Sequence, residues 1–485
     1  MNSIWTTDIN RKKRKQLIGE HKTKVAVIGG GMAGILTAYF LAEKGIETIV
    51  LEADVIGDGM TGSTTAKITS QHNLLYNYLL QTFGREQAFQ YLYANQAAVT
   101  EYKRLIHQKK IDCGYEKCAS YLYTLEKEEE LYQELNALLS LSYPAEIVTK
   151  TNLPFEIKCA LKFSEQGKFH PLLFLHAIAE HLTIFEQCRV VHVEENRIHT
   201  TAGSVLAEHI VFASHYPFML APGYYFMRMH QERSYVIAIE GAGRLDDIYL
   251  SADENGLSFR TYQNYMLVGG GSHRTGENTE GGRYKFLQEN INAMYPNHKE
   301  AARWSAQDCM SIDKIPYIGT FSSSQPNWYV ATGFGKWGMT NSMTAAKIIS
   351  GMIAEEEVDY ADVFSPQRFH LGASAKSIAE NSIEAVKGLT KRFFDIPEQS
   401  WKDLPRDFGS IVEYEGEKMG VYRDNEDHFY FVSVKCPHLG CELSWNEDEK
   451  SWDCPCHGSR FDYQGKLING PAQEDVCDDS LSWKE

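Results

Sequence analysis

The stretch KVAVIGGGMAGILTAYFLAEKGIETIVLEAD, residues 24–54, has the pattern of a strand, a tight turn, a helix and a second strand. Its apolar run at 25–28 is typical of a strand that is buried on both faces. Gly29, Gly31 and Gly34 follow this run at GxGxxG spacing. The first glycine permits the turn, the second lets the backbone approach a pyrophosphate, and the third lets helix and strand pack closely. The stretch therefore predicts a Rossmann-like dinucleotide-binding unit with a phosphate at the N-terminus of its helix.

Two further features indicate which dinucleotide binds. Glu52 ends the second strand, where a carboxylate can accept hydrogen bonds from an adenosine ribose. The next stretch, DGMTGSTTAKITSQHN at 58–73, is rich in glycine, serine and threonine. Its hydroxyl and N–H groups, including those of Thr64 and Thr65, suit a long phosphate–ribityl chain, whereas NAD-binding domains usually continue with another helix and strand. We therefore expect FAD as the cofactor.

A second glycine-rich segment lies far along the chain, WYVATGFGKWGMTNSMTAAKIISGMI at residues 328–353. A predicted strand runs into Gly333, Gly335 and Gly338, and a predicted helix begins next to Met339. A helix N-terminus at the pyrimidine edge of a flavin stabilises the negative charge that gathers there on reduction. We expect these residues to form the far half of the FAD site.

Together these motifs resemble the glycine oxidase/D-amino acid oxidase superfamily of FAD enzymes. Five further segments carry the resemblance, in this order along the chain: TGSTTAK (61–67), VVHV (190–193), VFAS (211–214), DKIPYIG (313–319) and TGFGKWGMT (332–340). The resemblance covers roughly residues 20–370. It implies that the backbone of the strand containing Val193 touches the adenine.

The same resemblance implies two domains within that range. An α/β, Rossmann-like FAD-binding domain is expected from about residues 20–75, 165–220 and 300–355, and an α+β substrate domain from about residues 75–165 and 220–300. In the substrate domain, Arg260 and Tyr262 would share one face of a strand and could clamp a substrate carboxylate. His72 follows the FAD loop, where the family often has a polar residue near the flavin. Further candidate contacts are Tyr225, His273 and Arg274, and for each of these side chains a structural role is the alternative.

Two details bear on the chemistry. Cys309 lies in a CM dipeptide similar to the one whose cysteine is attached to the flavin in sarcosine oxidases, although a small buried cysteine is the alternative. Amine oxidases that use oxygen commonly place a lysine above the flavin from the strand that matches residues 265–273. That strand has no lysine here, which favours a dehydrogenase.

The stretch CPHLGCELSWNEDEKSWDCPCHGSRF, residues 436–461, indicates a metal centre with one Cys–His pair in each of two loops. Zinc sites usually separate neighbouring ligands by two or more residues and would leave two cysteines unexplained. The pattern resembles the Rieske [2Fe–2S] domain, in which one iron takes two cysteines and the other takes two histidines. The resemblance extends through Pro471. The ligands that it implies are Cys436, His438, Cys454 and His457.

The Rieske resemblance also implies a Cys441–Cys456 disulfide that joins the two loops, as in the respiratory-like class. Ser459 can donate a hydrogen bond to a cluster sulfur, which raises the reduction potential. Phe461 stands where respiratory Rieske proteins usually have a tyrosine, so we expect a somewhat lower potential than theirs. Residues 401–485 are predicted to form a small all-β domain, after a helical linker over residues 371–400.

Composition excludes several other classes of protein. The net charge of −16 over 485 residues argues against general affinity for nucleic acid or anionic membranes. The run RKKRK at 11–15 is best explained as a short solvated arm. There is no signal-peptide pattern and no uncharged apolar run of about twenty residues, so we expect a cytoplasmic protein with no integral membrane segment.

The sequence thus favours FAD-dependent oxidation of an amine or amino-acid-like small molecule. Electrons would pass from the flavin to the Rieske cluster and on to an external acceptor that the sequence does not identify. One alternative is an electron-transfer flavoprotein that feeds a partner protein without an organic substrate of its own. A redox sensor that carries the cluster is a third possibility.

Overall fold

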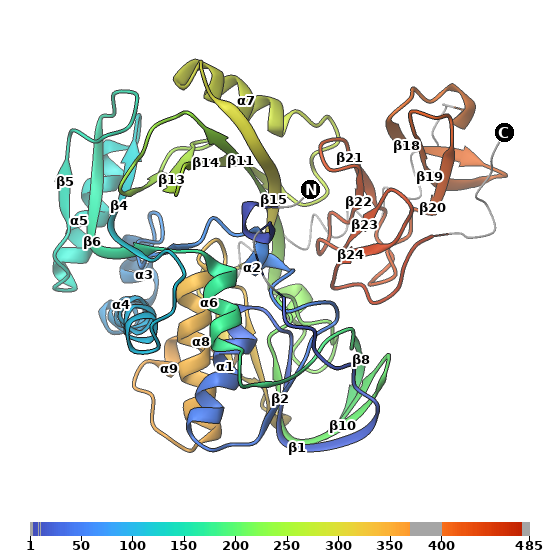
Figure 1. Cartoon of the computed structure of the whole chain (residues 1–485), viewed down its shortest axis with the longest axis horizontal. Helices are drawn as coiled ribbons and strands as arrows, with labels where there is room; N and C mark the ends of the chain where they lie inside the picture. Colours follow the sequence, from blue (N-terminus) through green and yellow to red (C-terminus); the bar gives the residue numbers. More distant parts are fainter. Residues whose placement is uncertain (1–2, 8, 10, 369–399, 478–485) are drawn as a thin grey trace.

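The structure is a computed structural model, and it describes residues 3–7, 9, 11–368 and 400–477. The linker helix expected after residue 370 lies outside these residues. Figure 1 shows three parts: a lower sheet with helices, an upper sheet, and a C-terminal domain on the right. Within the described part of the chain, no helix is long and apolar enough to cross a membrane.

The lower sheet is the dinucleotide-binding part. Strand β1 (Gly19–Ile28) pairs in parallel with β2 (Thr48–Leu51) and with β10 (Gly203–Phe212). The sheet order is β16-β17-β10-β1-β2-β7, with β9 pairing with β10 and β8. The remaining strands are β7 (Thr183–Phe185), β8 (Val190–Glu194), β9 (Arg197–Thr200), β16 (Tyr317–Ser322) and β17 (Gln325–Thr332). Residues 25–28 are all buried, because helices cover one face of β1 and the β8–β9 side covers the other. Their apolar run in the sequence predicted this double burial.

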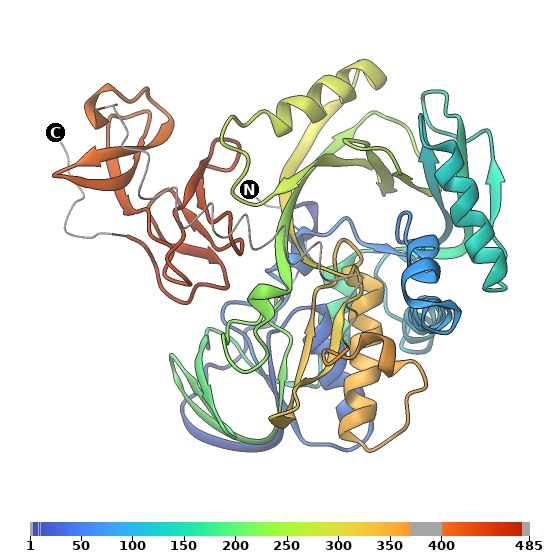
Figure 2. The same cartoon turned by 180° about the vertical axis from the view of Figure 1, so that it is seen from behind.

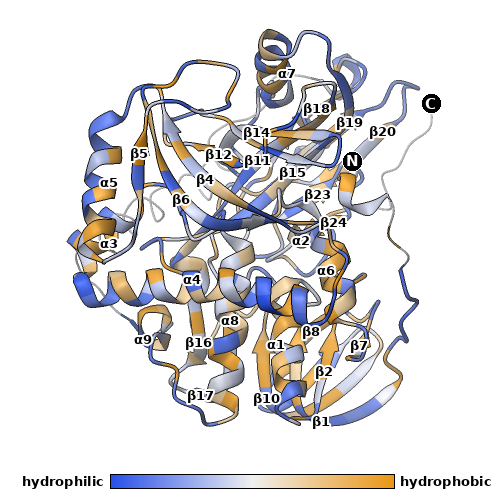
Figure 3. Ribbon diagram, turned by 60° about the vertical axis from the view of Figure 1, so that its left-hand side comes forward, coloured by the Kyte–Doolittle hydropathy of each residue, from blue (hydrophilic) through white to orange (hydrophobic). Residues whose placement is uncertain are grey.

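Helices α1 (Met32–Glu43) and α8 (Gly338–Ile353) pack against each other on one face of this sheet. Figure 3 shows hydrophobic colour on α1 and on the strands beside it, and mixed colours on α8. The remaining helices in the first 368 residues are η1 (Ile4–Thr6), α2 (Met60–Ser63), α3 (Tyr76–Phe83), α4 (Arg85–Gln108), α5 (Glu128–Ser140), α6 (Pro171–Ile178), η2 (Tyr225–Met227), α7 (Arg283–Met294) and α9 (Ala361–Phe364). The N-termini of α1 and α8 both point toward the upper sheet.

The upper sheet has the order β15-β11-β14-β13-β12-β4-β6-β3, with β5 on β6. Its strands are β3 (Lys67–Ile68), β4 (Glu116–Thr124), β5 (Glu146–Val148), β6 (Cys159–Lys168), β11 (Met229–Glu240), β12 (Ile248–Ser251), β13 (Ser258–Tyr262), β14 (Tyr265–Arg274) and β15 (Lys299–Ser311). Strands β11 and β15 pair along most of their length and run down toward the lower sheet. They therefore connect both sheets with the C-terminal domain.

The C-terminal domain is all-β, as predicted. One sheet contains β18 (Phe408–Tyr414), β19 (Glu417–Arg423) and β20 (Phe429–Ser433), preceded by η3 (Trp401–Asp403). The other contains β21 (Ser444–Asn446), β22 (Ser451–Asp453), β23 (Arg460–Asp462) and β24 (Leu467–Asn469). Figure 2 shows from behind that the second sheet lies beside β11 and β15.

Candidate functional site

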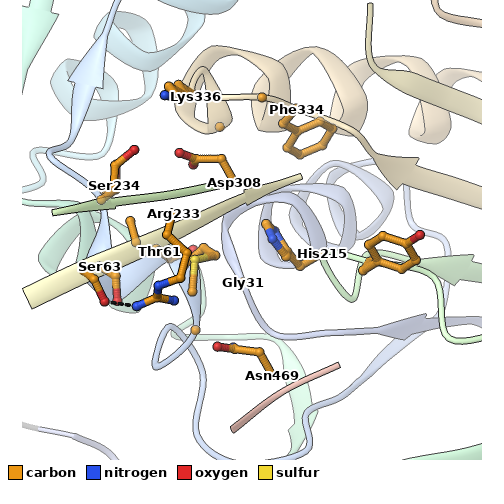
Figure 4. Close-up of a pocket in the computed structure, with 18 of the residues that line it drawn as sticks. Gly31, Thr61, Ser63, His215, Arg233, Ser234, Asp308, Phe334, Lys336 and Asn469 are labelled. Atoms are coloured by element: carbon orange, nitrogen blue, oxygen red, sulfur yellow. Dashed lines mark hydrogen bonds between the residues drawn. The ribbon is translucent and has the colours of Figure 1, made fainter. Parts of the chain in front are cut away.

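A cavity of about 890 Å³ lies where the two sheets and the C-terminal domain meet. This volume is within the range of cofactor and substrate sites. Its lining includes nine of the residues expected to bind FAD, namely Gly29, Gly31, Glu52, Thr64, Thr65, Gly333, Gly335, Gly338 and Met339. Figure 4 shows part of its wall, which includes side chains from β11, β15 and the C-terminal domain.

The glycine turn forms one end of the cavity. Gly29 has a φ of +109°, and a Cβ there would lie 2.5 Å from the carbonyl oxygen of Ala213. A Cβ at Gly34 would lie 1.9 Å from the carbonyl oxygen of Gly29. Only glycine fits at these two positions, which lets α1 begin directly beneath the turn. Gly34 itself packs the helix against the turn and does not line the cavity, as expected for the third glycine of the motif.

Glu52 lies at the end of β2, beside this turn. Its Oε2 accepts a hydrogen bond from the Gly30 N–H at 2.6 Å, and its Oε1 accepts one from the Asp54 N–H at 2.9 Å. Burial raises the pKa of the Glu52 carboxyl despite these hydrogen bonds. The side chain is thus fixed in the cavity wall with lone pairs left for a ribose hydroxyl. On the β8 side, Val190 lines the cavity, whereas Val193 is buried in the apolar cluster behind it.

His72 does not line the cavity. One ring nitrogen lies 2.8 Å from the Tyr91 hydroxyl, and the other lies 2.9 Å from the Thr69 carbonyl oxygen and 3.1 Å from Thr340 Oγ1. Burial lowers the pKa of His72 to about 3, so the ring is neutral. The ring stacks on Trp337 at a centroid distance of 4.7 Å, and Trp337 does line the cavity. His72 therefore packs against the segment before α8 and does not reach the cavity, where a catalytic residue would lie.

Arg260 and Tyr262 also lie outside the cavity lining. Arg260 is buried, and its Nη1 donates to the carbonyl oxygens of Thr65 at 2.7 Å, Ala66 at 2.5 Å and Phe169 at 3.2 Å. Tyr262 packs edge-on against Trp5 at 5.0 Å. The carboxylate clamp expected of this pair does not match the geometry, because the N-terminal segment and the residue 64–66 loop cover that face of β13. Arg260 instead holds the loop that contributes Thr64 and Thr65 to the cavity.

The other candidates likewise have structural contacts. The Tyr225 hydroxyl donates to the Phe321 carbonyl oxygen at 2.8 Å, and His273 contacts the Tyr235 hydroxyl at 3.1 Å. Cys309 is buried against Met229 and Thr332, and burial raises its thiol pKa to about 12. The cavity lining includes none of the candidates Tyr225, His273, Arg274 and Cys309. A flavin link at Cys309 does not fit this environment.

Several polar residues of the cavity wall were not among the site residues named from the sequence: Lys67, His215, Arg233, Ser234, Asp308 and Lys336. Two of them lie on β11 and one on β15, and Figure 4 shows Ser234 and Asp308 on the same side of these strands as Lys336. Alternation along β11 would not have identified these residues, because the consecutive residues Arg233 and Ser234 both line the cavity.

The metal centre lies in two loops of the C-terminal domain. A disulfide joins Cys441 to Cys456, as the Rieske pattern implied, and the Cys454 sulfur lies within 4.8 Å of both disulfide sulfurs. The thiols of Cys436 and Cys454 lie close enough to interact with each other. The rings of His438 and His457 approach to a centroid distance of 4.8 Å.

The histidine atoms test whether this centre suits iron. The Nδ1 atoms of His438 and His457 are buried and have no hydrogen-bond partner among the described residues. Buried polar atoms normally have a partner, so a bound metal is the natural explanation. Burial lowers the pKa of His438 to about 4 and that of His457 to about 3, which keeps both rings in the neutral form that ligates metals. Two thiols and two such imidazoles fit a Rieske cluster.

The loop with His457 is attached directly to the strands that border the cavity. Gln231 on β11 donates from Nε2 to the carbonyl oxygens of His457 at 2.6 Å and Gly470 at 3.2 Å. Gln307 on β15 donates to the Gly458 carbonyl oxygen at 2.8 Å and to Gln231 Oε1 at 2.6 Å. The two glutamines therefore fix the ligand loop by hydrogen bonds between neutral groups.

A buried ion pair makes a second junction. Arg233 Nη2 lies 2.8 Å from Glu449 Oε2, and the same carboxylate accepts hydrogen bonds from the Ser305 hydroxyl at 2.5 Å and the Tyr284 hydroxyl at 2.8 Å. Arg460 lies 3.6 Å from Glu449. Arg233, Ser305, Glu449 and Arg460 all line the cavity, so the C-terminal domain supplies part of its wall.

Comparison with known proteins agrees with both sites. The model of the FAD dependent oxidoreductase family matches residues 24–352, and that of the Rieske [2Fe-2S] domain matches residues 396–478. A Bacillus subtilis protein named "Putative Rieske 2Fe-2S iron-sulfur protein YhfW" is 33% identical over 97% of this chain and 96% of its own length. The cytochrome b6-f complex iron-sulfur subunit of Synechococcus elongatus is 34% identical over 21% of this chain and 51% of that subunit.

Solved structures show the same fold. Glycine oxidase from Geobacillus kaustophilus has a TM-score of 0.60 at 17% identity, covering 72% of this chain and 99% of the oxidase. L-proline dehydrogenase from P. horikoshii also has a TM-score of 0.60, at 16% identity, covering 73% and 99%. The chain therefore belongs to the FAD-dependent oxidoreductase family and carries a C-terminal Rieske domain, with FAD and one [2Fe–2S] cluster as its cofactors.

Proposed function

We propose that this protein oxidises an amine or amino-acid-like substrate with FAD and passes the electrons through the Rieske cluster to an external acceptor. The observation that carries the proposal is the attachment of the cluster loop to β11 and β15, whose residues also line the cavity. Structures of similar fold that are named glycine oxidase and L-proline dehydrogenase support a substrate with a C–N bond.

The chain's own residues would hold and orient the reactants. The glycine turn and the N-terminus of α1 would hold the FAD pyrophosphate, and Glu52 would hold the ribose. Residues 333–339 and the N-terminus of α8 would lie beside the flavin ring. When bound, FAD takes up two electrons from the substrate and the cluster carries them one at a time.

The C-terminal domain would have two tasks. It closes one side of the cavity through Glu449 and Arg460, which limits the access of water to that side. It also keeps its ligand loop at a constant place on β11 and β15 through Gln231 and Gln307. A cluster held in one position suits repeated electron transfer inside one chain. The expected cytoplasmic location is part of this proposal.

Anaerobic titration of the purified holoprotein with secondary amines, tertiary amines and amino acids tests the proposal. Flavin absorbance and the EPR signal of the reduced cluster are followed together. We expect a substrate to bleach the flavin and to produce the cluster signal. Bleaching with an oxidised cluster would overturn the internal relay. Reduction only by NAD(P)H or a protein donor would indicate an electron-transfer module without an organic substrate.

A further inference from the structure

Asp308 is a carboxylate of the cavity wall that has no hydrogen-bond donor among the described residues. It lies on β15 and lines the cavity, and Figure 4 shows its side chain in the same part of the wall as those of Ser234 and Lys336. Glu232 and Glu449, two acids that belong to or contact the same strands, each lie within 3.2 Å of a base. Asp308 has no such contact among the described residues, although its side chain faces a space large enough for a ligand.

The neighbouring cations are already engaged. Lys336 Nζ lies 3.2 Å from Glu232 Oε2 and donates to Ser272 Oγ at 2.7 Å. Arg233 pairs with Glu449 at 2.8 Å. Glu232 also contacts His230 at 3.5 Å, and although burial alone would raise its pKa, these partners lower it to about 2. Lys336 and Arg233 are thus each paired with another carboxylate, and Asp308 has no cationic partner of its own among the described residues.

The charge of Asp308 is therefore poorly stabilised in the structure. Burial raises its pKa to about 7, the charge of Glu232 adds to this effect, and Lys336 and Arg233 oppose it. A cation that entered the cavity would favour the ionised form and lower this pKa. Asp308 therefore has the properties of a carboxylate whose cationic partner is a ligand.

We propose that Asp308 binds the ammonium group of the substrate and accepts its proton, so that the substrate enters as a cationic amine. The inference rests on the proposed amine oxidation. One N–H bond of the ammonium breaks and one O–H bond forms on Asp308, which leaves a neutral amine and a neutral carboxylic acid. The nitrogen lone pair would then be free to assist the transfer of hydride from the neighbouring carbon to FAD, the oxidant of the proposed function. A base with a pKa near the working pH suits this transfer.

The proposal has a definite pH dependence. Below pH 7 Asp308 is increasingly protonated and loses its attraction for a cation, so affinity for a cation rises with pH through about 7. The charged groups that face Asp308 are Lys336, Glu232 and Arg233, and all three are held in ion pairs.

The test uses the oxidised holoprotein. Its probes are cations that have no C–H bond beside a free amine, so they bind without being oxidised. Tetramethylammonium and guanidinium chloride are titrated by calorimetry, with sodium chloride as the blank, against the wild type, Asp308→Asn and Asp112→Asn. Asp112 is an exposed acid outside the cavity, which makes it a matched control. We expect Asp308→Asn to weaken cation binding roughly tenfold or more and to remove its pH dependence near 7. Asp112→Asn should bind like the wild type.

Three outcomes separate this inference from the proposed function. If cations bind through Asp308 but no amine reduces the flavin, the cation site is supported and amine oxidation fails. If an amine reduces the flavin at the same rate and with the same pH profile in Asp308→Asn, the inference is overturned and the function stands. If Asp308→Asn loses FAD, measured by its absorbance per protein, Asp308 contacts the cofactor and the inference is also overturned.

Discussion

The four ligands predicted for the metal centre all lie within residues 436–457, whereas the cavity takes its walls from segments between Ile28 and Gln473. One disulfide and two loops are enough to shape the centre. The cavity needs both large sheets and the C-terminal domain in place at once. We therefore expect the loss of one cluster ligand to leave the two large sheets and the FAD end of the cavity in place, whereas a change in the cavity's frame should affect the whole molecule.

Removing a cluster ligand is the strongest test of this independence. Cys454→Ser is expected to abolish the EPR signal of the reduced cluster, because a serine hydroxyl is a poor ligand for this iron. FAD content and substrate-driven bleaching of the flavin should persist, and reduction of an artificial one-electron acceptor should be lost. Cys159→Ala, which removes a buried thiol of the upper sheet, should keep the signal. A full cluster signal in Cys454→Ser would contradict the ligand assignment.

The glycine turn tests the frame of the cavity. In Gly34→Ala the new methyl group would meet the Gly29 carbonyl oxygen at 1.9 Å, so the turn and α1 must separate. We expect a loss of roughly 1–3 kcal/mol or more in stability and a large fall in FAD content. Thermal unfolding measures the stability, and flavin absorbance per protein measures the FAD content.

Gly45→Ala, just beyond the end of α1, is the matched control, because a Cβ there would meet nothing within 4 Å and Gly45 does not line the cavity. Its φ of +71° costs an alanine about 1–2 kcal/mol in stability, so the comparison of the two variants rests on FAD content. This variant should keep its FAD. Equal FAD content in the two variants would show that close packing at Gly34 is not needed for the cofactor site.

The same contrast explains what could be predicted from sequence. The cluster ligands and the glycine turn depend on short, local spacing, so their residues could be named beforehand. Arg260 and Tyr262 were placed on one face of a strand, but alternation does not show that Trp5 and residues 64–66 cover that face. Gln231 and Gln307 join the cluster loop through amide hydrogen bonds, which leave no pattern in either segment. Contacts between distant segments were therefore the part that the sequence could not reveal.

The Glu449 junction joins the two regions. Glu449→Gln leaves Arg233 buried without a full counter-charge, and breaking such a pair costs about 3–5 kcal/mol. Glu447→Gln is the matched control in the same loop, because the Glu447–Lys450 pair is more exposed and is worth about 0–1 kcal/mol. Thermal unfolding of the holoprotein measures both. Equal losses would mean that the buried pair does not hold the domain.

This junction also predicts an effect of acid. Burial alone would raise the pKa of Glu449, but the charges of Arg233 and Arg460 and the hydrogen bonds from Ser305 and Tyr284 hold it below its usual value. A depressed pKa means that the stabilisation is present above the unfolded-state pKa of about 4.3 and is lost as the pH falls below it. Wild-type stability should therefore fall more steeply below about pH 4 than that of Glu449→Gln. Parallel pH curves for the two proteins would contradict this assignment.

The smallest expected effect concerns the cluster alone. Ser459 Oγ accepts a hydrogen bond from the Ala472 N–H at 3.0 Å, which directs its own O–H toward Cys436, with which it hydrogen bonds. Ser459→Ala removes that donor from a cluster sulfur, so negative charge on the reduced cluster is less well stabilised. If the hydrogen bond is worth about 1 kcal/mol, the reduction potential falls by roughly 40 mV. An EPR-monitored redox titration measures the shift, and Ser410→Ala, on β18, should leave the potential unchanged. An unchanged potential in Ser459→Ala would show that this hydroxyl does not tune the cluster, while FAD content should be the same in all three proteins because the centre is built locally.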